Sequence, residues 1–260
     1  MKYGRKVKTS AVMIQMLREL KTIRRPPGVE HSVFYTPSTD RVELFCTLLG
    51  RNPEKAIVVA HPAVVGGYYE HVVALAEVLS GFFSVVTFDF RGHGRSTGRC
   101  PLGFSKVSED LEAVVERVRG MGFKRIGVAG FSLGAAAAML LASRDDCFDA
   151  LVSIGCPPRM PDIPLLTRHR YLSVSAARIL GMRLDPTSCD GPSPIDVAER
   201  LPGFPKLLMF GEWEVVPQEE ISEFVGLISG PKTVLTVPGA WHADLMGREG
   251  LVSRWFCENL

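Results

Sequence analysis

One serine of this chain lies between two glycines, where an apolar run meets an alanine-rich segment. Residues 126–131 read IGVAGF and residues 133–139 read LGAAAAM, with Ser132 between them. The apolar run predicts a buried strand and the alanine-rich segment predicts a helix. Gly130 and Gly134 would then let strand and helix approach closely, because glycine has no Cβ. A turn of this kind projects a hydroxyl as a nucleophile, and a serine that caps the helix is the structural alternative.

A serine hydroxyl is a weak nucleophile and needs a general base beside it. The candidate is His242, which follows the last apolar run in the sequence VPGAWHA at 237–243. A surface histidine at the start of the closing helix is the alternative interpretation. The N–H of Leu133, at the first turn of the helix, would point toward an oxyanion that develops during attack.

The histidine in turn needs a carboxylate to orient it and to stabilise the imidazolium. The sequence GEWEVVP at 211–217 follows the preceding apolar run and holds two glutamates. We assign Glu214 as the acid, with Glu212 as the second candidate and Asp162 as a third. The chain order would be serine, acid, histidine.

These residues follow strands of a regular alternating pattern. Apolar and β-branched runs predict strands over 29–35, 42–49, 56–60, 82–88, 125–129, 150–154, 206–210 and 233–237. Helical periodicity predicts helices over 69–79, 107–118, 133–142, 172–180, 218–228 and 245–259. The first two strands form an expected hairpin around 37–40. The remaining alternation predicts an α/β fold with a mostly parallel sheet of about eight strands and helices on both faces. Ligands bind at the carboxyl ends of such strands, which is where the candidate residues fall.

Taken together, the motifs resemble those of the α/β-hydrolase superfamily, close to the serine aminopeptidase-like and monoacylglycerol-lipase-like esterases. The resemblance covers most of residues 30–258. It is carried by GFSLG at 130–134, DFRGHGRSTG at 89–98, AHPA at 60–63, GEWEVVP at 211–217 and PGAWH at 238–242. It implies the α/β-hydrolase fold over 29–260, with a short cap insertion at 157–200.

The resemblance also implies roles for residues in the loops. The family usually has His-Gly where this chain has His61 and Pro62, and the second oxyanion donor implied is the N–H of Ala63. The family usually has Asp at the place of Glu214, and this acid loop is one residue shorter, so the longer glutamate arm would span the gap. The segment at 89–98 becomes a structural turn. Its spacing, G-x-G-x-x-x-G with no helix following at once, does not match a dinucleotide fingerprint.

A serine at the elbow favours acyl chemistry. We expect a serine hydrolase that cleaves a carboxylic ester, or a related acyl bond, through an acyl-enzyme on Ser132. A thioesterase or an aminopeptidase-type hydrolase is an alternative, and so is a non-catalytic hydrolase-fold binding protein. The short cap predicts small-molecule acyl esters of short to medium chain length. The mechanism needs no metal and no organic cofactor.

Composition bounds the remaining properties. The 260 residues carry a net charge of +2, and the six cysteines form no C-x-x-C pair. No apolar run of about 18 residues predicts a membrane span, and the amino terminus has no signal-peptide pattern, so we expect a cytoplasmic protein. Residues 1–25 carry eight Lys or Arg and one Glu. The segment 1–28 therefore predicts a basic helical extension. It could contact a membrane surface, but we favour a solvated helix, and we expect no nucleic-acid partner.

Overall fold

The computed structural model describes residues 25–144, 146–160, 177–178, 181–188, 191–245 and 247–260. Its strands are β1 (His31–Pro37), β2 (Glu43–Leu49), β3 (Lys55–Ala60), β4 (Ser84–Phe88), β5 (Cys100–Pro101), β6 (Arg125–Phe131), β7 (Ala150–Ile154), β8 (Leu184–Asp185), β9 (Lys206–Trp213) and β10 (Lys232–Trp241). Its helices are α2 (Glu70–Leu79), α3 (Ser105–Gly120), α4 (Leu133–Ala142), α7 (Pro194–Val197), the 3₁₀ turn η1 (Ala198–Arg200), α8 (Gln218–Leu227) and α9 (Glu249–Asn259).

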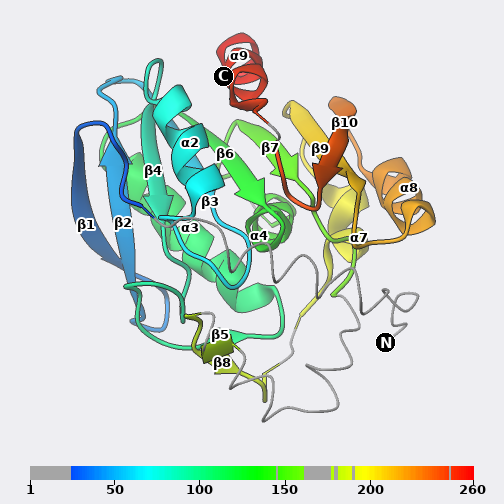
Figure 1. The fold of residues 1–260 in the computed structure, drawn as a ribbon, viewed down its shortest axis with the longest axis horizontal. Coiled ribbons are helices and arrows are strands. Elements are labelled where there is room, and N and C mark those ends of the chain that lie inside the picture. Colours follow the sequence, from blue (N-terminus) through cyan, green and yellow to red (C-terminus); the bar gives the residue numbers. More distant parts are fainter. Residues whose placement is uncertain (1–24, 145, 161–176, 179–180, 189–190, 246) are drawn as a thin grey trace.

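Eight of these strands form one sheet in the order β1-β2-β4-β3-β6-β7-β9-β10, with β1 at the left and β10 at the right of Figure 1. The pairs β1–β2 and β2–β4 are antiparallel, and the other five pairs are parallel. The predicted hairpin and the predicted mostly parallel sheet of about eight strands are both confirmed.

Helices cover both faces of the sheet, which explains why β3 is apolar at every position after Lys55. Ala56, Val58 and Ala60 pack into the core formed with α3 and α4. Ile57 and Val59 pack into a second core formed with α2 and α9. Because successive side chains of a strand point to opposite faces, a strand buried on both faces must be apolar at every position.

Two elements near the carboxyl end of the chain differ from the sequence-based prediction. Strand β10 continues to Trp241, past the exposed Pro238, with a register shift between Val237 and Trp241. Proline is tolerated there because β9 is the only partner of β10 among the described strands, so the missing N–H is not needed on the outer side. Turns with hydrogen bonds from Asp244 and Arg248 follow, and the closing helix therefore begins at residue 249 rather than 245.

The predicted cap at 157–200 is described in part. Its described residues include β8, which pairs with β5 in a small second sheet, and α7, which begins with a capping box between Ser193 and Asp196. The sequence did not predict these short elements. The helix expected at 172–180 lies almost entirely outside the described residues, as does most of the basic extension at 1–28.

Candidate active site

The turn at Ser132 has the strained geometry that the two glycines suggested. Ser132 has φ 48° and ψ −102°, a left-handed conformation that costs a non-glycine residue about 1–3 kcal/mol. A Cβ added at Gly130 would lie 2.5 Å from the Ala135 nitrogen, and one added at Gly134 would lie 2.3 Å from the Ala60 oxygen. Only glycine fits at either place, so the sequence pattern reflects the close packing of α4 against β6 and β3.

The Ser132 hydroxyl lies beside the predicted histidine. Its Oγ is 2.8 Å from Nε2 of His242, although 110 residues separate the two in sequence. His242 directly follows β10 and is buried, while Ser132 directly follows β6. Both residues leave the carboxyl ends of strands at the same edge of the sheet, which is why the topology brings them together.

Glu214 completes the chain of contacts. Its Oε2 accepts a hydrogen bond from Nδ1 of His242, and its Oε1 accepts one of 2.9 Å from the backbone N–H of Gly211. The Glu214 side chain is 4% exposed. A carboxylate only accepts hydrogen bonds, so Nδ1 of His242 carries the proton. In the neutral ring the lone pair of Nε2 then faces the serine hydroxyl.

Glu212, the second candidate acid, bonds elsewhere in the described structure. Oε2 of Glu212 accepts a hydrogen bond of 2.8 Å from the backbone N–H of Gly239 at an exposed site. Asp162 lies outside the described residues. Of the two glutamates in the acid loop, the structure brings Glu214 to His242.

The close approach of β9 and β10 brings the acid loop to the histidine. A Cβ at Gly211 would lie 2.4 Å from the carbonyl oxygen of Trp241, the residue before His242. Trp213, the residue before Glu214, pairs in register with Trp241. The two strand ends thus run side by side, and the glutamate arm covers the distance that remains.

The two expected oxyanion donors also lie at this edge. Leu133 is the first residue of α4, where backbone N–H groups have no acceptor within the helix. Ala63 lies in the loop after β3, whose last residue, Ala60, pairs with Gly130 just before the serine. The backbone at Val64 is left-handed, with φ 63°, which is rare for a β-branched residue.

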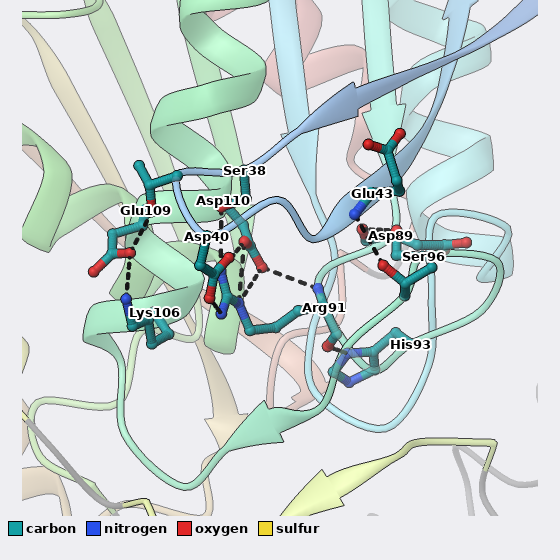
Figure 2. Close-up of polar contacts among 12 residues, drawn as sticks. Ser38, Asp40, Glu43, Asp89, Arg91, His93, Ser96, Lys106, Glu109 and Asp110 are labelled. Atoms are coloured by element: carbon teal, nitrogen blue, oxygen red, sulfur yellow. Dashed lines mark hydrogen bonds and ion pairs between the residues drawn. The ribbon is translucent and has the colours of Figure 1, made fainter.

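The loops around the site are tied together by buried charged groups. Asp89, after β4, accepts hydrogen bonds from the N–H groups of Gly67 (2.7 Å) and Arg95 (2.8 Å). Arg91 is 4% exposed and bridges Asp110 of α3 (2.6 Å) and Asp40 of the β1–β2 turn (2.7 Å), as Figure 2 shows. Asp89 and Arg91 are thus buried partners of neighbouring loops.

These contacts affect the ionisation of Arg91 and its neighbours. Burial lowers the pKa of Arg91, but the hydrogen bonds with Asp110 and Asp40 outweigh that effect and raise it above the ordinary value. The hydrogen bond from Arg91 lowers the pKa of Asp40. Burial and the neighbouring His61 lower the pKa of His93 to about 3, so its ring stays neutral.

One contact of the site was not predicted from sequence. Nδ1 of His61 lies 2.6 Å from the carbonyl oxygen of Pro62, and Nε2 lies 2.9 Å from the backbone nitrogen of Phe90. The motif AHPA marked the position but not these partners, because Phe90 is 29 residues away on another loop. The only available signal was a histidine between a buried strand and a proline.

Two other features are absent from the part of the chain that the structure describes. No group of three or more His, Cys, Asp or Glu in this part of the chain could hold a metal ion. None of the described helices has the length and apolar character needed to cross a membrane.

A mostly parallel sheet with helices on both faces, and a serine at a strained strand-to-helix turn, define the α/β-hydrolase class of fold. The family model described as the alpha/beta hydrolase family matches residues 57–252, and the chain belongs to this family. No curated protein matches the chain by sequence.

Several solved structures share the fold. An esterase of Pyrococcus furiosus has 21% identity and a TM-score of 0.68, over 92% of this chain and 98% of its own. The α/β hydrolase GrgF from Penicillium sp. sh18 has 14% identity and a TM-score of 0.72, over 88% and 97%. Est1E from Butyrivibrio proteoclasticus, solved with ferulic acid bound, has 20% identity and a TM-score of 0.64, over 87% and 98%. At these identities the similarity establishes the fold alone.

Proposed function

We propose that this protein is a serine hydrolase that cleaves a carboxylic ester, or a related acyl bond, through an acyl-enzyme on Ser132. The observation that carries the proposal is the continuous chain of hydrogen bonds from Ser132 through His242 to Glu214. Each group in that chain can act as the hydrogen-bond donor or acceptor that nucleophilic catalysis requires. Nε2 is free of a proton and can accept the one on the hydroxyl, and the carboxylate can stabilise the imidazolium that results.

The reaction follows from these positions. His242 takes the proton as Ser132 Oγ attacks the acyl carbonyl, and a tetrahedral intermediate forms. The N–H groups of Leu133 and Ala63 donate hydrogen bonds to its oxyanion. The imidazolium then protonates the leaving group, and an acyl-enzyme remains on the serine. Water, activated by the same histidine, attacks this ester and releases the acid and the free enzyme.

The substrate class is an acyl ester of short to medium chain length. The esterases among the structural neighbours favour an ester over an amide. The short insertion at 157–200 supports an acyl group of limited length, because fewer residues are available there to enclose a long chain. The described residues of this insertion form only short elements.

Turnover of three model substrates tests the proposal. Nitrophenyl acetate, an acetyl thioester and an alanine anilide are compared for the wild type and for Ser132→Ala. We expect the ester to be the best substrate, with its hydrolysis reduced to background in Ser132→Ala. A preference for the thioester or the anilide would select one of the alternative hydrolases. Equal rates for the two proteins on all three would contradict a serine mechanism and support a binding protein.

A series of nitrophenyl esters tests the acyl-chain preference. We expect kcat/KM to reach a maximum at short or medium chains and then to fall. A rise that continues to long chains would contradict the assignment of chain length, and would leave the serine mechanism intact.

A further inference from the structure

The hydrogen bonds of His61 fix its tautomer. The backbone N–H of Phe90 can only donate, so Nε2 of His61, at 2.9 Å, must accept and carries no proton. The carbonyl of Pro62 can only accept, so Nδ1, at 2.6 Å, must carry the proton and donate it. His61 is therefore a neutral ring with a proton on Nδ1, and it links the loop after β3 to the loop after β4.

The ring has little freedom to move. His61 is fully buried, and its ring packs edge-on against Phe90 and His93, with centroid distances of 4.9 and 4.8 Å. The neighbouring His93 shows that a buried ring in this position need not form hydrogen bonds at both of its nitrogens. Nδ1 of His93 lies 3.0 Å from the carbonyl of Arg91, but its Nε2 has no hydrogen-bond partner among the described residues.

The acceptor of the His61 proton belongs to the same peptide group as the Ala63 N–H. The Pro62–Ala63 peptide bond is trans, so its C=O and N–H point to opposite sides of one rigid plane. A hydrogen bond that fixes the carbonyl therefore also fixes the direction of the N–H. The next residue, Val64, is held at φ 63°, so this part of the loop does not rest in a conformation that its sequence prefers.

We propose that His61 is a positioning residue, which holds the Pro62–Ala63 peptide so that the Ala63 N–H faces the oxyanion formed at Ser132. The inference rests on the proposed function. It assigns His61 no contact with the substrate and no proton transfer. Its effect belongs to the transition state, because the oxyanion is a stronger acceptor than the carbonyl of the bound ester.

Two substitutions separate this role from a purely structural one. In His61→Asn, the side-chain amide nitrogen lies near the position of Nδ1 and can still donate to Pro62, while the Phe90 N–H loses its acceptor. In His61→Gln, the amide oxygen lies near the position of Nε2 and can accept from Phe90, while the Pro62 carbonyl loses its donor. Each variant removes one buried hydrogen bond, so the two are matched in their structural cost.

The proposal predicts that kcat separates the two variants. Loss of one oxyanion donor lowers kcat by about 100- to 1000-fold, and a misaligned donor retains part of its effect. We therefore expect kcat of His61→Gln to fall about 10- to 100-fold, with KM within about threefold of the wild type. His61→Asn, which keeps the hydrogen bond to Pro62, should lose at least about fivefold less kcat than His61→Gln. Binding of an aryl trifluoromethyl ketone, which forms an oxyanion on the enzyme, should weaken in parallel with kcat.

The experiment measures kcat, KM and ketone affinity for the wild type and both variants, at a temperature where thermal melts show all three to be folded. Equal losses of kcat in the two variants, or a wild-type kcat in His61→Gln, would overturn the proposal. Labelling of the wild type by a fluorophosphonate distinguishes failure of the proposed function from failure of the His61 inference. An unlabelled wild type overturns the proposed function and this inference with it, whereas a labelled wild type with equal rates in both variants overturns the inference alone.

A second measurement needs no variant to fold. Nitrogen-15 spectra of the histidine rings report which nitrogen carries the proton. We expect His61 of the wild type to be neutral and protonated at Nδ1. Protonation at Nε2 would remove the hydrogen bond to the Pro62 carbonyl and would overturn the proposal.

Discussion

Replacing Glu214 tests the proposed acid of the site, which is a glutamate where the resembling family usually has an aspartate. The Glu214 carboxylate contacts Nδ1 of His242 with one oxygen and the Gly211 N–H with the other. Glu214→Asp removes one methylene, which draws the carboxylate back by about 1.5 Å. The contact with the imidazole then lengthens beyond hydrogen-bond distance. Glu214→Gln keeps the length and removes the charge that stabilises the imidazolium.

The expected losses follow from these changes. A neutral amide in place of the acid of a triad lowers kcat by about 10⁴, or about 5 kcal/mol of transition-state stabilisation. We expect Glu214→Gln to lose about 10³- to 10⁴-fold, and Glu214→Asp to lose about 10²- to 10³-fold because the retracted carboxylate no longer reaches the imidazole. The assay is kcat/KM on a nitrophenyl ester, with thermal melts to show that both variants are folded.

Glu212→Gln is the matched control, because it lies two residues away in the same loop and bonds to Gly239 instead. Its activity should stay within about threefold of the wild type. The reasoning would be refuted if Glu212→Gln lost as much activity as Glu214→Gln, since the acid would then be the other glutamate. It would also be refuted if Glu214→Asp kept wild-type activity.

Three further predictions concern the serine, the base and a buried lysine. Ser132→Gly should be more stable than Ser132→Ala by about 1–2 kcal/mol in urea unfolding, because glycine relieves the left-handed backbone; equal stabilities would argue against strain there. Ester hydrolysis should rise with pH between about 5 and 8, because only neutral His242 accepts the serine proton; a flat rate profile would contradict its role as base. Burial lowers the pKa of Lys206 from 10.5 to about 8, so between these values the unfolded chain binds a proton that the folded chain does not. The stability of the wild type relative to Lys206→Met should therefore rise across this window, by at most about 3 kcal/mol, and a constant difference would contradict the shift.

The parts of the fold that local sequence determines were predictable. The strands β3 and β7 are apolar at almost every position because both of their faces are buried. Such a run predicts a buried strand even when its neighbouring strands are unknown. The elbow was predictable for a similar reason, since the spacing of Gly130 and Gly134 around Ser132 reflects contacts within one strand–turn–helix unit and its neighbouring strand.

The remaining features depend on contacts between distant segments. The length of β10 depends on its pairing with β9, which carries it beyond Pro238, whereas the apolar run alone ends earlier. The sequence favoured Glu214 over Glu212 as the acid, but the contact of Glu214 with His242 depends on how the ends of β9 and β10 come together in the fold. The link from His61 to Phe90 has the same origin, because it joins two loops that only the folded sheet brings together.

The most direct test of the central claim is the site of covalent labelling by a fluorophosphonate, read by intact mass and peptide mapping. The hydrogen-bonded arrangement of Ser132, His242 and Glu214 predicts one adduct per chain, located on Ser132. It also predicts that labelling is lost in Ser132→Ala and strongly slowed in His242→Gln. An unlabelled wild type, an adduct on another residue, or unchanged labelling in His242→Gln would contradict the claim that this serine is activated by this histidine.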